Sequence, residues 1–171
     1  IPLEERAAVK YLISDMYNPY IRYVDKYFPN AVSVVDSFHV IQWITHKIDM
    51  YIRNLIKDFK KRDREIYISN GGIIDEHTYI PASREVYLLQ KYKWLILANQ
   101  SSITYHNELR MDTKLRCLMN TYDYEDSLFT IDPTLRTLRD LKELYVQFNA
   151  RNAGKPMDAR LELDYLIDKY I

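Results

Sequence analysis

Two aspartates near the N-terminus each follow directly on a short apolar run. The run Val9–Ser14 ends at Asp15. The run Ala31–Val35 ends at Asp36, and His39 follows three residues later. Such β-branched runs are typical of buried parallel strands, whose carboxyl ends meet at the edge of a sheet where ligands and metals bind. The pattern therefore predicts two carboxylates side by side at a common site.

The carboxylate of Asp15 suits a hard divalent cation. Magnesium prefers carboxylate oxygens and keeps several waters for its substrate. The same position also suits a turn or a helix cap, because Asn18 and Pro19 follow and mark the start of a helix. Position alone leaves both roles open for Asp15.

Asp36 and His39 form an Asp-x-x-His pattern at a predicted junction between a strand and a helix. If Asp36 caps that helix, both side chains can face the same edge as Asp15. Capping alone also explains Asp36, and His39 suits a hydrogen-bond donor to a site or an ordinary polar residue. The other histidines have no Cys or His partners at zinc spacing, which argues against structural zinc. We expect them at the surface: His46, His77 and His106.

A basic run supplies candidate contacts to a phosphate backbone. Between residues 53 and 64 there are only two carboxylates, Asp58 and Asp63. The same segment contains six cations: Arg53, Lys57, Lys60, Lys61, Arg62 and Arg64. The solvated end of a long helix has the same composition, because its dipole favours cations there. DNA binding and simple solvation both remain possible for this run.

Composition limits the class of protein. The 171 residues are 47% hydrophobic and 28% charged, and 24 Lys and Arg balance 24 Asp and Glu, so nucleic-acid contacts must be local. The single Cys117 excludes an internal disulfide, and no apolar run is long enough to span a bilayer. We expect a cytoplasmic protein without membrane contact. Glycine-rich phosphate loops, nucleophile elbows and Cys-x-x-Cys pairs are absent, which removes most familiar enzyme classes.

The first part of the chain is predicted to alternate strands and helices. Residues 10–14 and 31–35 should be strands, residues 19–27 a helix, and a second helix should begin near Ser37. This order is typical of an α/β fold with a parallel strand pair. The second helix carries apolar residues at three- and four-residue steps, from Ile41 to Phe59, and must pack on other elements.

Residues Ser69–Gly72 contain two of the three glycines and predict an architectural boundary. We therefore expect an α/β domain over residues 1–65 and an all-helical domain over residues 66–171, mostly helical overall. The predicted helices of the second domain cover residues 83–98, 102–120, 134–149 and 159–170. The sixteen tyrosines lie at helix spacing, so we expect most of them to have half-buried rings with solvated hydroxyls.

The order of these features resembles the ISL3-type insertion-sequence transposases. The resemblance is strongest over Val9–Trp43, where it rests on the segments Tyr11–Tyr20, Phe28–Ala31 and Val34–Ile41. The family's helical region is resembled by Tyr87–Leu97 and, more weakly, by Leu138–Phe148. In that family a ribonuclease-H-like core carries two aspartates and a glutamate that bind two divalent metals, and a helical domain is inserted before the glutamate. The resemblance implies that residues 1–65 are part of that core and that residues 66–171 are most of the insertion.

The resemblance also assigns roles. Asp15 matches the second catalytic aspartate, and Asp36 with His39 matches an auxiliary (Cys/Asp)-x-x-His motif. The implied activity is cleavage and joining of DNA phosphodiesters at transposon ends, with Mg²⁺ or Mn²⁺ as cofactor. The first aspartate should precede Ile1, and the glutamate should follow Ile171. We therefore expect an internal fragment that is inactive, binds no metal by itself, and can self-associate through open sheet edges.

Two other interpretations remain open. One is a non-catalytic interaction module, in which the helical half binds a partner and the α/β part is a scaffold. This alternative expects Asp15 and Asp36 to diverge, or no pocket to join them. The other is a different metal-dependent phosphoryl-transfer domain or a receiver-like domain, which expects a complete parallel sheet within the chain.

Overall fold

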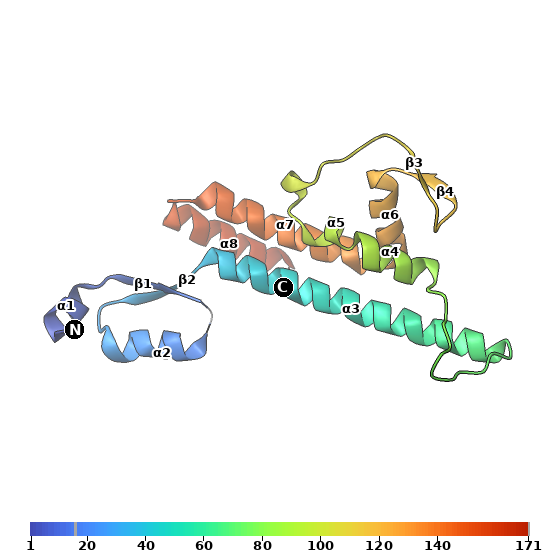
Figure 1. Ribbon diagram of the computed structural model, residues 1–171. Helices are drawn as coiled ribbons and strands as arrows, with labels where there is room; N and C mark the ends of the chain where they lie inside the picture. Colours follow the sequence, from blue (N-terminus) through green and yellow to red (C-terminus); the bar gives the residue numbers. More distant parts are fainter. Residues whose placement is uncertain (16, 171) are drawn as a thin grey trace. The chain divides into compact units, whose positions relative to one another are not determined.

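The computed structural model describes residues 1–15 and 17–170 and is mostly helical, with two small sheets (Figure 1). Side chains are described except at 156, 167, 169 and 170. The elements in chain order are α1 (Leu3–Ala8), β1 (Tyr11–Ser14), α2 (Asn18–Tyr27), β2 (Val32–Val35), α3 (Ser37–Ser69), α4 (Arg84–Tyr92), α5 (Trp94–Leu97), the 3₁₀ turn η1 (Gln100–Ser102), β3 (Arg110–Asp112), β4 (Cys117–Met119), α6 (Thr121–Ile131), α7 (Thr134–Asn152) and α8 (Pro156–Tyr170).

The chain divides into two compact units. The first, here the sheet unit, contains Ile1–Ile44 together with the C-terminal residues from Asn149 onward. The second, here the helical unit, is Thr45–Phe148. Helices α3 and α7 each contribute residues to both units. The predicted domain boundary between residues 65 and 66 stays a prediction.

In the sheet unit, β1 and β2 pair in parallel, with Tyr11 opposite Val32 and Ser14 opposite Val35. Helix α2 contacts both strands and buries Val24 beneath them. Pro19 lies in the first turn of α2, and the helix ends before Phe28, as the sequence predicts. The strand–helix–strand order and the parallel pair are therefore confirmed. Helix α1 has no counterpart among the predicted elements.

The other face of this small sheet is exposed. Residues at alternate positions of both strands turn to that face, and Ile13 is 69% exposed. The two strands are the whole parallel sheet in the described part of the chain. The complete sheet that a receiver-like domain requires is not found there.

The helical unit contains most of the buried apolar side chains. Helix α3 buries Ile48 and Ile52, both on the predicted apolar stripe. Most of the rest of this core comes from the other helices and includes Val86, Leu88, Leu89, Leu95, Ile96, Leu128, Phe129 and Leu135. Within the described residues, no helix is long and apolar enough to cross a membrane.

A fully buried lysine, Lys142, binds the carbonyls at the C-terminal end of α5. The Lys142 ammonium donates to the carbonyls of Ile96 at 3.3 Å and Leu97 at 3.0 Å, and also to that of Ala98. It lies 3.0 Å from Glu143 Oε1, which accepts the Gln100 backbone N–H at 3.0 Å. A cation at the carboxyl end of a helix satisfies carbonyls that have no partner in the helix. Lys142 is therefore a structural residue.

Two predictions about the C-terminal half were wrong. The predicted helix over residues 102–120 is not found: residues 103–109 are irregular and residues 110–119 form an antiparallel hairpin of β3 and β4, so this half is not all-helical. The physical reason is Asp112, whose carboxylate accepts two backbone N–H groups of the turn and thereby stabilises a bend that a helix cannot contain. The predicted helix over residues 83–98 is divided at Lys93 into α4 and α5.

Candidate functional site

The carboxyl ends of β1 and β2 bring two aspartates to one edge of the parallel sheet. Ser14 and Val35 are the last paired residues of the two strands, and each is followed directly by an aspartate. The Asp36 backbone N–H donates to the Ser14 carbonyl at 3.0 Å, so the pairing continues to the edge. The structure thus brings Asp15 and Asp36 to the same strand edge, as the sequence pattern predicts.

Asp15 is half-buried and is held by a local turn. Its Oδ1 accepts the backbone N–H of Tyr17 at 3.0 Å, and its carbonyl accepts the Ser14 hydroxyl at 3.1 Å. This side-chain bond two residues ahead orders the start of α2. Among the residues that the structure describes, Oδ2 of Asp15 accepts no hydrogen bond. The hydrogen bond to Oδ1 therefore orients the Asp15 carboxylate, and Oδ2 has no donor among the described residues.

Asp36 has the same arrangement at the start of α3. Its Oδ1 accepts the Phe38 backbone N–H at 2.9 Å, which makes it a cap of this helix. Its Oδ2 also accepts no hydrogen bond from the described residues. The backbone N–H of His39 donates to the Asp36 carbonyl at 3.0 Å, and the half-buried His39 ring lies edge-on to Phe38. Capping therefore leaves one oxygen of Asp36 available for a second role.

The six cations of the basic run do not form one set. Five of them are exposed on α3: Arg53, Lys57, Lys60, Lys61 and Arg64. Arg62 instead lies 3.2 Å from Glu85 Oε1 on α4, and its guanidinium covers the Phe59 ring. Arg62 thus serves the contact between two helices, whereas the other five face away from the core of the helical unit.

A cluster of tyrosines around Asp112 is the part of the structure that the sequence did not reveal. Asp112 Oδ2 accepts the hydroxyls of Tyr87 at 2.8 Å, Tyr92 at 3.1 Å and Tyr124 at 3.0 Å. Oδ1 accepts the backbone N–H groups of residues 114 and 115, each at 3.0 Å. These three rings are half-buried, as predicted for most of the tyrosines, but their hydroxyls bind Asp112 and are exceptions to the predicted solvation. The only signal in the sequence was the abundance of tyrosine.

These contacts change the acidity of the groups involved. Burial by itself raises the pKa of Asp112, but hydrogen bonds from the Leu115 N–H and the tyrosine hydroxyls outweigh it and lower that pKa to about 2. Burial also raises the pKa of Tyr92, and so do its hydroxyl contacts with Tyr124 and Asp112. Asp112 is therefore a buried anion whose hydrogen-bond donors are neutral, with the Lys91 ammonium 3.9 Å from Oδ2, and both of its oxygens are used.

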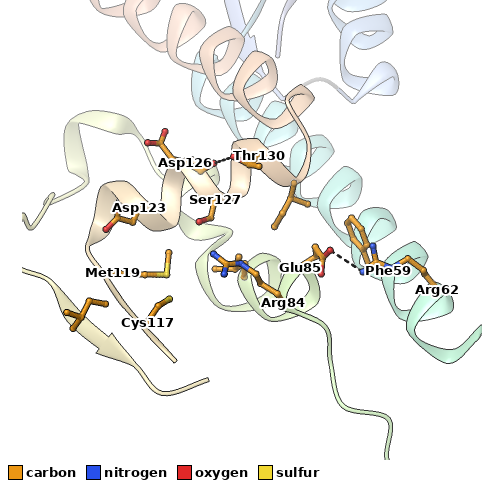
Figure 2. A pocket seen from close by; sticks show the side chains of 13 residues that line it. Phe59, Arg62, Arg84, Glu85, Cys117, Met119, Asp123, Asp126, Ser127 and Thr130 are labelled. Carbon is orange, nitrogen blue, oxygen red and sulfur yellow. Dashed lines mark hydrogen bonds and ion pairs between the residues drawn. The ribbon is translucent and has the colours of Figure 1, made fainter. Parts of the chain in front are cut away.

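The helical unit also contains an open cavity of about 800 Å³ bordered by α3, α4, β4 and α6 (Figure 2). Arg84 and Glu85 of α4 line it together with Asp123 and Ser127 of α6. Figure 2 shows the ion pair between Arg62 and Glu85 at one side of this space. The lining carries both signs of charge, so the cavity favours neither an anion nor a cation.

The expected exposure of His46, His77 and His106 is confirmed, and these residues lie outside the cavity lining.

Comparison with known proteins tests the resemblance seen in the sequence. No curated protein and no solved structure matches the chain. The family model of ISL3-type DDE transposases, described as transposase, matches residues 1–170. The match includes the strand edge, the basic helix α3 and the helical unit, so it does not depend on one motif. The chain therefore belongs to the ISL3 family of DDE transposases.

Proposed function

We propose that this chain supplies part of the catalytic core of a DDE transposase, with Asp15 as one of its three metal-holding carboxylates. The observation that carries the proposal is the register of β1 and β2, whose last paired residues are each followed by an aspartate. Family membership supports DNA phosphodiesters as the substrate and cleavage and joining as the reaction. Asp36 and His39 act as auxiliary residues at the same edge.

The sheet unit is the corresponding part of a ribonuclease-H-like core. Helix α2 covers one face of the β1–β2 sheet, and the opposite face is exposed at Tyr11, Ile13, Val32 and Val34. Parallel sheets normally have both faces covered, and two strands alone are marginally stable. Both observations support a larger sheet to which β1 and β2 belong.

Magnesium or manganese is implied by the family. Among the described residues, no group of three or more His, Cys, Asp or Glu side chains could hold a metal ion. The free Oδ2 oxygens of Asp15 and Asp36 fit a contribution to such a site, because hard divalent cations prefer carboxylate oxygen. The first aspartate and the glutamate are then supplied by residues outside this chain, and the chain alone is inactive. The chemistry that bound ions would supply is activation of water or a 3′-hydroxyl and stabilisation of the leaving oxygen at the phosphodiester.

The chain's own residues orient these oxygens. The Tyr17 N–H fixes the Oδ1 of Asp15, so rotation of the carboxylate is restricted and Oδ2 stays at the strand edge. The Phe38 N–H does the same for Asp36. The bond from the His39 N–H to the Asp36 carbonyl orders the first turn of α3 and sets the position of the His39 ring. Such preorganisation reduces the cost of assembling a catalytic site.

The test is metal-dependent cleavage of transposon-end DNA by a longer form of the protein that includes all three carboxylates. Asp15→Asn keeps an oxygen acceptor for the Tyr17 N–H but removes the charge, and Asp15→Ala removes both. We expect either variant to lower the cleavage rate by at least about a thousandfold, because charge neutralisation and positioning are lost together. DNA binding should stay close to that of the wild type.

Asp25→Ala is the matched control. Asp25 is an exposed carboxylate on α2 of the same unit, and its removal should leave the rate unchanged. If the Asp15 variants cut DNA as fast as the wild type, Asp15 has no catalytic role. If a folded, metal-loaded wild type cuts no transposon-end DNA, the interaction-module interpretation becomes the better one.

Asp36 and His39 require a separate measurement. We expect Asp36→Asn and His39→Ala to lower the cleavage rate partially, and to raise the magnesium concentration that gives half-maximal rate. Asn at position 36 preserves the helix cap, so a changed metal dependence would not result from lost capping. An unchanged rate and metal dependence in both variants would leave Asp36 with the capping role alone.

A further inference from the structure

Five cations of α3 form one exposed stripe, here the basic stripe: Arg53, Lys57, Lys60, Lys61 and Arg64. They recur at steps of three and four residues, which places them on one side of a helix. The buried Ile48 and Ile52 and the half-buried Phe59 lie on the other side. The basic stripe therefore faces away from the core of the helical unit.

Three members of the stripe are uncompensated. Arg53 lies 2.6 Å from Asp49, and Lys61 lies 4.0 Å from Glu65. Lys57, Lys60 and Arg64 have no ion pair or hydrogen bond from their side chains to any of the described residues. Their positive charges are available to an external anion.

Of the two carboxylates within the run, Asp58 is exposed and Asp63 is directed toward a neighbouring segment. Asp63 Oδ2 accepts the backbone N–H of Ser83 at 3.0 Å, and its side chain is only 10% exposed. Arg62, next to it, pairs with Glu85 and covers Phe59. The fold thus separates the residues that join α3 to its neighbours from those that face solvent.

We infer that the basic stripe binds the phosphate backbone of duplex DNA, an inference that rests on the proposed function. Lys57 and Arg64 are separated by about 10 Å of helix axis, given the usual rise per residue. Duplex DNA carries on the order of six phosphate charges over that length. Since the net charge of the chain is zero, attraction to DNA depends on such local surfaces.

An anionic membrane is a poorer match for this surface. A helix that lies in a membrane interface needs large apolar side chains beside its cations. In the described stretch from Arg53 to Arg64, no large apolar side chain is exposed. Between Arg53 and Arg64 the stripe offers charge without an apolar anchor, and exposed apolar side chains of α3, such as Met50 and Ile68, lie beyond its two ends. The charged stretch itself suits a phosphate backbone better than a lipid surface.

The experiment measures binding of the whole chain to a fluorescein-labelled duplex of about 30 base pairs by anisotropy, at several salt concentrations between about 50 and 200 mM. The stripe variant carries Lys57→Gln, Lys60→Gln and Arg64→Gln. The control variant carries Arg110→Gln, Lys114→Gln and Arg136→Gln, which remove the same charge from exposed positions of the same unit. Circular dichroism checks that both variants keep their helices.

We expect the stripe variant to lower the slope of log Kd against log salt by about 3, and to weaken binding at least about tenfold at low salt. The control variant should keep the slope of the wild type. Each single substitution in the stripe should lower the slope by about 1. These single variants give the same answer if the triple variant fails to fold.

Equal losses in the stripe and control variants would overturn the inference, because they would show attraction by charge alone. Unchanged DNA binding in the stripe variant would also overturn it. So would loss of binding to phosphatidylserine vesicles without loss of DNA binding. None of these results affects the cleavage assay with the Asp15 variants, so failure of the stripe and failure of the proposed function are distinguishable.

Discussion

At the edge of the parallel sheet, the side chains of Asp15 and Asp36 each accept one backbone hydrogen bond and, as far as the described residues go, keep one oxygen without a donor, whereas the Asp112 side chain in the helical unit accepts five hydrogen bonds. Asp15 and Asp36 are half-buried, and the Asp112 side chain is 1% exposed. A carboxylate whose acceptors are all used has nothing to offer a ligand, but a free oxygen at a strand edge can bind a cation.

The same difference extends to the surroundings of each group. The donors to Asp15 and Asp36 are close in sequence, and their loss would disturb a single turn. The donors to Asp112 come from α4, from α6 and from the hairpin turn, so this carboxylate connects three elements. We therefore expect Asp112 to determine stability and Asp15 to determine activity.

Asp112→Ala tests this division most strongly. The substitution leaves three tyrosine hydroxyls and two backbone N–H groups without their acceptor, and we expect it to lower the free energy of unfolding by about 4 kcal/mol. Urea unfolding measures this change. Asp15→Ala should alter the same quantity by less than about 0.5 kcal/mol, as is usual for partly exposed positions. Equal destabilisation by the two substitutions would remove the proposed distinction.

Lys142→Met should have the second-largest effect. Methionine preserves most of the volume but removes the buried ammonium that three carbonyls and Glu143 share. Because Glu143 would then be a buried carboxylate without its cation, we expect a loss of about 3 kcal/mol. Lys114→Met, at an exposed position, is the control. A loss no larger than that of the control would mean that water replaces the ammonium.

The pH dependence of stability should also reflect Asp112. Its pKa is about 2 in the folded chain, below the ordinary value near 3.9, so the unfolded chain binds more protons between these values. Asp112 therefore contributes stability above about pH 4 that is lost as the pH falls toward 2. Asp112→Asn should flatten this part of the curve of unfolding free energy against pH. A curve as steep as that of the wild type would assign the acid sensitivity to other carboxylates.

The strand edge could be predicted because its signals are local. An apolar run that ends on Asp15, and another that ends on Asp36, contain the strand and the site residue within a few positions. Proline in the first turn of α2 marked the start of that helix equally well. The partners that Asp15 and Asp36 bind outside their own turns cannot be predicted from such short segments, because those partners are not part of them.

The Asp112 cluster could not be predicted, because its members are distant in sequence. Tyr87 and Tyr92 lie 25 and 20 residues before Asp112, and Tyr124 lies 12 residues after it. The segment around Asp112 has helical periodicity, and these tertiary contacts add to the local hydrogen bonds of the turn in stabilising the hairpin. Likewise, the division of the basic run into a stripe and Arg62 depends on where α4 packs.

The smallest expected effect concerns the turn that Asp112 holds. Arg116 has a φ of 55°, in the left-handed region that is unfavourable for residues with a Cβ, and its N–H donates to the Asp112 carbonyl at 2.7 Å. Glycine adopts this conformation without strain, although it is also more flexible when unfolded. We expect Arg116→Gly to raise the free energy of unfolding by about 0.5 kcal/mol. In an Asp112→Ala background the gain should shrink, because the turn is no longer held in that conformation. A gain of equal size in both backgrounds, measured by urea unfolding, would show that Asp112 does not impose the backbone of the turn.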